Sequence, residues 1–284
     1  MADYDLPQGS AAQAVDFFHE SADDYARKHY HQAVRSFMTE RQRCVLKFLD
    51  DLRLPRGAEI LDAGCGPGHL VEAVASLGYR VSAMDAAEGM LRSAQTRLGA
   101  AAPEFPVQFQ LGDIERLPYP NASFDVVLST GVIEYLDGDA KVLQEFRRVL
   151  RPGGHLILPV TNIWSPTNWF DFVIEPLKRQ SWIRTPLNAV WTRLGRTAIL
   201  PRHFRVRRHR PARFRQALRE AGFVLQDATY FHFLPWPRPL DQFFPRATAA
   251  LGKRLEAHAR SCLRLIGEGY LTCSQLPGEH RPKA

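Results

Sequence analysis

The stretch LDAGCGPGHL, residues 61–70, places three glycines within five positions directly after a short apolar run. The apolar run AEILDAGC is typical of a short buried strand, and GHLVEAVASLG is typical of a helix that ends at a glycine. Gly64, Gly66 and Gly68 therefore lie in a turn from strand to helix. Glycines there let the backbone adopt positive φ angles and approach a ligand, which the free N–H groups of the helix start would face.

The alternation of strands and helices continues along the rest of the chain. Further strands are expected at YRVSAMD, VQFQLGD, FDVVLST, HLILPVT, VLQDATYFHF and GYLTCSQL, and helices at residues 12–50, 86–99, 137–154 and 211–223. Strands separated by helices of about ten residues favour right-handed crossovers and a parallel sheet covered on both faces. The sequence therefore predicts an α/β fold with a doubly wound sheet.

Acidic residues end two of these expected strands. Asp85 ends VSAMD, where a carboxylate can accept hydrogen bonds from both hydroxyls of a ribose. Asp113 ends QLGD, where a carboxylate or the neighbouring backbone can bind an exocyclic amine. A nicotinamide enzyme would share the first acid, but its glycine pattern is GxGxxG, whereas the pattern here is GxGxG. The glycine spacing therefore weighs against a dinucleotide.

With these motifs the chain resembles the class I S-adenosylmethionine-dependent methyltransferases, in the broad group that includes the ubiquinone and small-molecule methyltransferases. The resemblance rests on LDAGCGPGHL, MDAAEGML, LGDIERLPYPNASFDVV and VLRPGGHLIL, and it covers residues 40–161 closely and 203–276 more loosely. It implies a seven-stranded sheet whose last strand runs antiparallel, with a helical insertion between the fifth and sixth strands. It also implies S-adenosyl-L-methionine as the cofactor.

The resemblance further implies which residues contact this cofactor. From its amino-acid part through the ribose to the adenine, they are Asp62, Gly64, Gly66, Gly68, Asp85, Met84 or Met90, and Asp113 with Ile114. The N-terminal helix would fold over the cofactor, with Tyr25 or Tyr30 near its carboxylate. The alternative is that these acids only cap turns and that the tyrosine rings only pack on the core.

Catalytic residues are harder to find because methyl transfer from a sulfonium mainly needs an aligned nucleophile and a site shielded from water. We expect Tyr135 and Glu134 at the rim of the site, with Tyr135 as a catalytic residue. We expect His203 to be the base because it follows the insertion that would roof the pocket, although it could equally be a surface histidine. His232 is a further candidate. Some ubiquinone-type O-methyltransferases hold a metal with Glu, Glu and His after the fourth strand, but here only Glu134 matches, so we expect no metal.

The insertion suggests the kind of acceptor. Four of the five tryptophans lie in it, at positions 164, 169, 182 and 191. From Lys178 to Arg215 the chain has twelve Lys or Arg and no Asp or Glu, although its net charge is only +7. Tryptophans beside an uninterrupted basic stretch are typical of a segment at an anionic membrane surface. We therefore expect residues 164–215 to contact such a surface, and a lipidic, quinone or isoprenoid-like acceptor to be methylated there, on oxygen.

Other functions stay open. The aromatic segment could be a lid over a soluble sugar or natural-product acceptor, or the protein could be a cofactor-binding scaffold without catalysis. Nucleic acid is disfavoured because no RNA-binding module accompanies the basic stretch. The N-terminus MADYDLPQGS lacks the apolar segment of a signal peptide, and the four scattered cysteines have no CxxC pattern. We expect a cytoplasmic protein, peripheral on the inner face of the membrane.

The chain divides by sequence into five parts. Residues 1–50 are expected to form a helical cap, 51–161 the Rossmann-like cofactor-binding core and 162–202 the Trp- and Arg-rich insertion. Residues 203–276 would complete the core sheet, and 277–284 read as a disordered tail.

Overall fold

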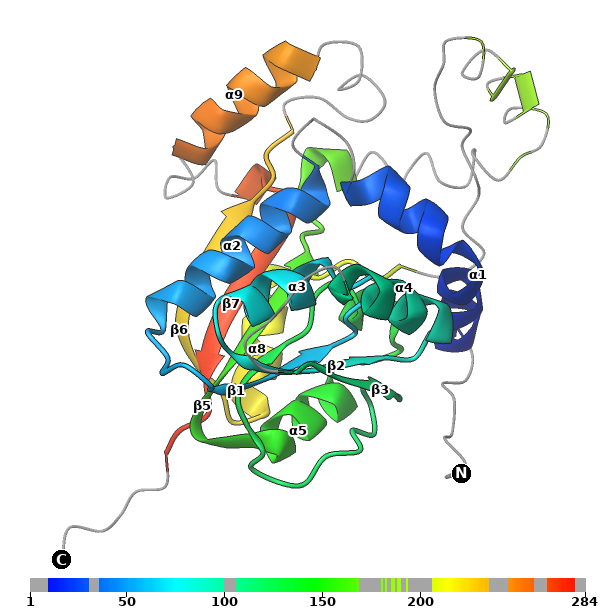
Figure 1. Ribbon diagram of the computed structural model, residues 1–284. Helices are drawn as coiled ribbons and strands as arrows, with labels where there is room; N and C mark the ends of the chain where they lie inside the picture. Colours follow the sequence, from blue (N-terminus) through cyan, green and yellow to red (C-terminus); the bar gives the residue numbers. More distant parts are fainter. Residues whose placement is uncertain are drawn as a thin grey trace, which may run out of the picture.

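A computed structural model describes residues 10–30, 36–99, 106–168, 206–234, 245–257 and 265–278, with isolated positions between 180 and 193. Seven strands form one sheet in the order β3-β2-β1-β4-β5-β7-β6 (Figure 1). They are β1 (Glu59–Ala63), β2 (Arg80–Asp85), β3 (Gln108–Leu111), β4 (Phe124–Leu128), β5 (Leu150–Thr161), β6 (Val224–Phe231) and β7 (Gly269–Gln275). Only β7 pairs antiparallel with its neighbours. The predicted seven-stranded α/β sheet with an antiparallel last strand is confirmed.

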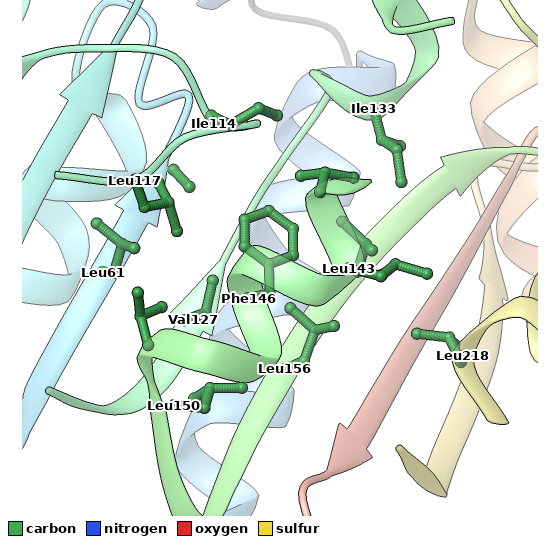
Figure 2. Close-up of a cluster of buried hydrophobic side chains, with 14 of the residues drawn as sticks. Leu61, Ile114, Leu117, Val127, Ile133, Leu143, Phe146, Leu150, Leu156 and Leu218 are labelled. Atoms are coloured by element: carbon green, nitrogen blue, oxygen red, sulfur yellow. The ribbon is translucent and has the colours of Figure 1, made fainter. Parts of the chain in front are cut away.

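Helices cover both faces of this sheet. The helices α2 (Phe37–Asp51), α3 (His69–Ser76) and α4 (Glu88–Leu98) lie on one face, and α5 (Ala140–Val149) and α8 (Pro211–Glu220) lie on the other (Figure 1). Neighbouring strand residues serve opposite faces: Ile60 packs with the α2 and α3 side, and Leu61 with the α5 side. Figure 2 shows the cluster of buried apolar side chains on the α5 side, with Phe146 of α5 beside Val127 and Leu156 of the sheet.

The N-terminal region differs from the single helix predicted over residues 12–50. The structure has two helices, α1 (Ser10–Tyr30) and α2, and the second begins with a capping box. Thr39 N donates to Ser36 Oγ at 3.2 Å, and Ser36 N donates to Thr39 Oγ1 at 3.0 Å. The reciprocal bonds satisfy backbone groups that start a new helix, which neither Gly nor Pro signals in this stretch. The prediction of one continuous helix was wrong.

Two more elements depart from the predictions. The helix expected to stop at Pro152-Gly153-Gly154 already ends at Val149, and β5 begins at Leu150, which pairs with Phe124. The sequence also gave no indication of α9 (Pro245–Ala257), whose Gly252 approaches the backbone of Phe233: a Cβ there would lie 2.7 Å from Phe233 O.

Several predicted segments lie outside the described residues. They are most of the insertion, the Pro-rich stretch 235–244, Cys262 and the end of the tail from residue 279. Cys44, Cys65 and Cys273 are buried free thiols, as predicted for them. Among the helices that are described, none combines the length and the apolar character needed to cross a membrane. The five sequence-based parts of the chain stay a prediction.

Candidate cofactor and acceptor site

A cavity of about 870 Å³, counting the part open to solvent, lies at the carboxyl ends of β1, β2 and β4 and is covered by α1. Eight of the residues predicted for the site line it: Tyr25, Gly64, Gly66, Asp85, Met90, Asp113, Ile114 and Tyr135. They come from segments up to about a hundred residues apart in the sequence. The structure therefore brings most of the predicted cofactor residues together in one place.

The three glycines of the β1–α3 turn have different structural roles. Gly64 and Gly68 have φ angles of +87° and +81°, and a Cβ on Gly64 would overlap Val132. A Cβ on Gly68 would lie 2.7 Å from that of Ala94, so this glycine lets α3 pack against α4 and does not line the cavity. Gly66, with φ +52°, has no atom within 4 Å of its missing Cβ. The turn therefore leaves open space in front of its backbone.

Asp85 is fixed at the end of β2 by two backbone donors. Gly66 N donates to Oδ2 at 2.8 Å, and Ala87 N donates to Oδ1 at 2.9 Å. Burial raises the pKa of Asp85, and these backbone hydrogen bonds lower it. Each oxygen keeps a second lone pair, so both can still accept hydrogen bonds from a ligand on the cavity side. Asp113, held through Glu115 N at 2.9 Å, occupies the corresponding place after β3.

Asp62 lies behind the glycine turn, fully buried at the end of β1. Within the described part of the chain neither of its carboxylate oxygens has a hydrogen-bond partner. Burial and the nearby Asp85 raise the pKa of Asp62 to about 7, against the opposing effect of Arg41. A buried carboxyl group without donors is costly. Its chemistry therefore fits a cationic or hydrogen-bond-donating group of a ligand, such as the ammonium of S-adenosylmethionine.

Arg41 was missed by the sequence analysis. It lies on α2, is only 7% exposed and lines the cavity, with its guanidinium 5.9 Å from the centre of the Phe37 ring. A side chain on Gly131 would overlap this guanidinium, so the absence of a Cβ there makes room for it. A signal did exist: Arg41 falls on the same helical stripe as Val45, Phe48 and other buried residues of α2. A cation on an apolar stripe indicates a buried anionic partner or ligand.

Aromatic and apolar side chains close the cavity from above. The ring of Phe18 on α1 contacts Tyr25 edge-on at 5.4 Å and Tyr135 at 5.3 Å. Tyr135 belongs to a short helix, η1 (Ile133–Tyr135), that follows β4. Met90 also lines the wall, whereas Met84 is buried in the core. The side chain of Tyr30 lies outside the described ones.

The chain that returns after the insertion is anchored beside η1. Arg207 N donates to Glu134 O at 2.7 Å, and Arg207 also pairs with Asp139. His209 Nε2 lies 3.2 Å from Asp139 Oδ1. Burial would raise the pKa of Asp139, but its bonds with His209 and Arg207 hold this pKa below the usual value. Glu134, predicted at the rim, is buried and accepts from Thr161 Oγ1 at 3.1 Å.

His203, the predicted base, lies outside the described residues, so its position gives no support for that role. Within the described ranges no group of three or more His, Cys, Asp or Glu side chains could hold a metal ion.

Known proteins resemble this chain in sequence. Residues 61–158 match the family model of a methyltransferase domain. A malonyl-[acyl-carrier protein] O-methyltransferase of Erwinia pyrifoliae is 30% identical over 220 residues, which are 78% of this chain and 72% of that protein. The ubiquinone biosynthesis O-methyltransferase of Xanthomonas axonopodis pv. citri is 29% identical, over 64% of this chain and 69% of that protein.

Other likenesses are more local or concern the fold alone. A malonyl-[acyl-carrier protein] O-methyltransferase of Serratia marcescens is 39% identical, but over only 36% of this chain and 37% of that relative's length. The magnesium protoporphyrin IX methyltransferase of Synechocystis PCC 6803, solved with bound SAH, superposes with a TM-score of 0.57. That superposition covers 94% of this chain and 99% of the other at 17% identity.

Proposed function

The chain belongs to the class I S-adenosylmethionine-dependent methyltransferases, and from this premise we propose that it methylates an oxygen atom of a hydrophobic acceptor. Its cofactor is S-adenosylmethionine, which supplies an activated methyl group. The family and the cofactor follow from the sequence relatives. The acceptor and the roles of individual residues are what is proposed here.

The cavity walls support an arrangement of residues around the cofactor. Asp85 accepts hydrogen bonds from the ribose hydroxyls, and Asp113 with Ile114 contacts the adenine. Arg41, in the cavity wall, pairs with the carboxylate of the amino-acid part. Asp62, whose buried oxygens have no hydrogen-bond partner in the described part of the chain, accepts from the ammonium. An arginine and an unpartnered carboxyl beside one glycine turn match the two opposite charges of an amino acid.

The observation that carries the acceptor proposal is the apolar part of the cavity lining. It includes Val15 and Phe18 from α1 and Val132, Tyr135 and Leu136 in and beside η1. Such a wall excludes water from the reacting methyl group and favours an acceptor with an apolar body. The similarity to a ubiquinone biosynthesis O-methyltransferase supports a quinone-like acceptor.

A membrane surface is the proposed source of this acceptor. Trp164 is 57% exposed and Trp182 is 74% exposed. The guanidinium of Arg210 lies 5.6 Å from the centre of the Trp164 ring. Exposed tryptophans beside cations favour the interface between lipid headgroups and acyl chains. We propose a cytoplasmic protein that binds peripherally to an anionic membrane through residues 164–215.

The acceptor proposal is tested with purified protein, methyl-labelled S-adenosylmethionine and an extract of host cells, followed by partition between organic solvent and water. We expect the label in the organic phase. Label on small molecules in the aqueous phase would instead support a sugar or natural-product acceptor. If no label is transferred with any fraction of the extract, the protein is a cofactor-binding scaffold and the proposal fails.

A second candidate acceptor is a group carried by an acidic protein. The relatives in Erwinia and Serratia are named for a malonyl group on acyl-carrier protein. The twelve Lys or Arg between Lys178 and Arg215 would attract such a carrier as well as a membrane. Label that stays with protein in the aqueous phase would favour this candidate.

A further inference from the structure

A buried histidine and a buried glutamate face each other near the cavity but outside its walls. His232 directly follows β6, and Glu268 directly precedes β7. Their side chains are 9% and 2% exposed, and His232 Nδ1 lies 2.6 Å from Glu268 Oε2. Because β6 runs parallel to β5, its carboxyl end lies at the same edge of the sheet as the carboxyl ends that form the cofactor cavity.

The backbone around this pair is held firmly. Glu268 N donates to His232 O at 3.0 Å, and Glu268 O accepts from Asn162 N at 2.8 Å and from Asn168 Nδ2 at 3.0 Å. His232 adopts a φ of +55°, in the left-handed region that residues other than glycine seldom adopt. The missing side chain of Gly269 leaves room for the Phe231 ring. These contacts fix the orientation of the imidazole and the carboxylate.

A short chain of contacts connects the pair with the cavity. The imidazole of His232 packs edge-on against the Phe37 ring, with centres 5.6 Å apart. The Phe37 ring in turn contacts the guanidinium of Arg41, and Arg41 lines the cavity. The half of the sheet edge formed by β5, β7 and β6 adjoins the cofactor half, so the pair lies at the same edge of the sheet as the cavity.

The hydrogen bond determines which nitrogen is available. An ionised carboxylate can only accept, so Nδ1 of the neutral imidazole carries the proton and Nε2 keeps its lone pair. Within the described part of the chain, the side-chain hydrogen bond found for His232 is the one made by Nδ1, and none involves Nε2. A carboxylate that fixes the tautomer and stabilises the imidazolium is the arrangement that makes a histidine an effective general base.

We propose that His232, oriented by Glu268, is the general base for an acceptor hydroxyl group; this rests on the proposed O-methylation. The hydroxyl oxygen forms a new bond to the methyl carbon. The bond between that carbon and the cofactor sulfur breaks, and its electron pair stays on the sulfur. The hydroxyl proton goes to Nε2, and Glu268 stabilises the resulting imidazolium.

A general base at His232 restricts the acceptor to groups that must lose a proton as they react. An alcohol or a phenol, with a pKa of about 10 or higher, carries a proton at neutral pH and needs a base as it reacts. A carboxyl group with a pKa near 4 is already ionised and needs none. The pair therefore favours a hydroxyl acceptor, such as a hydroxylated quinone precursor, over the carboxyl of a malonyl group.

A second buried histidine offers a matched control. His209 also lies beside a carboxylate, Asp139, but there Nε2 makes the contact and Arg207 already pairs with the acid. Its Nδ1 is buried without a partner in the described residues. His209 is thus held in the anchor of the returning chain through Nε2, the nitrogen proposed as the base in His232.

The test compares His232→Asn, Glu268→Gln and the control His209→Asn, with labelled S-adenosylmethionine and the extract fraction that accepts label from the wild type. Asparagine tolerates a positive φ, so His232→Asn keeps the backbone conformation. We expect turnover to fall about 10²-fold or more in His232→Asn and less in Glu268→Gln. The affinity for the cofactor, measured by calorimetry, should stay within about twofold in all three, and thermal unfolding checks that each variant folds.

The pH profile separates a base from a structural residue. The wild type and His209→Asn should lose turnover at low pH as the base is protonated, and His232→Asn should lack this dependence. Charged groups on the elements around the imidazole include Glu268 itself, Glu40, Arg41, Arg43, Lys47, Asp50 and Asp51 on α2, and Lys253, Arg254 and Glu256 on α9. All of these and Asp62, whose pKa is raised to about 7, remain in His232→Asn. A pH profile of turnover in this variant that equals the wild-type profile therefore belongs to one of them and overturns the proposal.

Treating the labelled product with mild alkali identifies the acceptor group, because methyl esters release methanol and methyl ethers do not. We expect alkali-stable label. Label released as methanol, or turnover of His232→Asn within about twofold of the wild type, would overturn the proposal while leaving the methyltransferase activity intact. Absence of transfer by the wild type would instead refute the proposed function on which it rests.

Discussion

At the scale of single residues, the site combines charges that are buried before any ligand binds. The pKa of Asp62 is raised to about 7 by burial and by Asp85. In the unfolded chain an aspartate has a pKa near 3.9, so between these two values the folded state binds more protons. Stability contributed by protonated Asp62 is present below about pH 4 and is lost as the pH rises toward 7.

We predict that Asp62→Asn removes this pH dependence. Each unit of pKa difference corresponds to about 1.4 kcal/mol, so the cofactor-free variant should gain stability relative to the wild type at pH 8 and little at pH 4. Thermal unfolding at several pH values measures this. Parallel losses of stability with pH in both proteins would contradict the raised pKa.

The buried Arg41 leads to a prediction about cofactor affinity. Charge-assisted hydrogen bonds contribute about 1.5–3 kcal/mol, so Arg41→Gln should weaken the binding of S-adenosylmethionine by about ten- to a hundredfold. The control is Arg43→Gln on the same helix, whose side chain is 55% exposed and pairs with Glu40. Equal affinities of the two variants in calorimetric titration would show that Arg41 has no role in cofactor binding.

Single residues also show how much of the site could be predicted from the sequence. The glycines and acids of the site could be named because each follows a strand, and strands of a parallel sheet end at one edge. Arg41 and Glu268 could not, because their roles depend on contacts between segments distant in the sequence, and His232 was named only as one candidate among several. His203, chosen as base from its place after the insertion, stays a prediction.

At the scale of elements, the break between α1 and α2 positions the cavity. The capping box of Ser36 and Thr39 starts α2 so that Arg41 lies at the cavity, while α1 crosses α4. Periodicity alone predicted a continuous helix because both helices are amphipathic and no Gly or Pro separates them. Two small polar side chains that accept hydrogen bonds from each other's backbone N–H groups are a weaker sequence signal than a Gly or a Pro.

We predict that Ser36→Ala lowers the free energy of unfolding by about 1 kcal/mol, the usual cost of losing an N-cap. Because the first turn of α2 carries Arg41, cofactor affinity should weaken as well. The control is Ser76→Ala, whose hydroxyl donates to Glu72 O within α3. Chemical denaturation measures both variants, and an equal small effect in the two would contradict a structural role of the capping box.

At the scale of the whole molecule, the alternation of strands and helices was sufficient to predict a doubly wound sheet, because crossover connections restrict the order of parallel strands. The antiparallel placement of β7 between β5 and β6 followed from family resemblance, since the residues of β7 do not encode direction. Element boundaries at β5 and α9 depended on tertiary packing and were missed.

The basic, Trp-containing segment leads to a prediction about membranes. We expect the protein to float with vesicles that contain anionic phospholipid at low salt and to float less at high salt, because screening weakens the attraction. The double variant Trp164→Ala and Trp182→Ala should float less. The control is Leu77→Ala, because Leu77 is an exposed apolar residue outside residues 164–215, and it should float like the wild type. Protein that stays at the bottom of the gradient at low salt contradicts membrane binding.

The central claim is that the cavity at the carboxyl ends of β1, β2 and β4 binds S-adenosylmethionine. Calorimetric titration of the wild type and of Asp85→Asn tests it most directly. The account predicts one binding site in the wild type, about tenfold or greater weakening in Asp85→Asn, and no comparable binding of NAD. Equal affinity of the two proteins for S-adenosylmethionine, or tight binding of NAD, would contradict it.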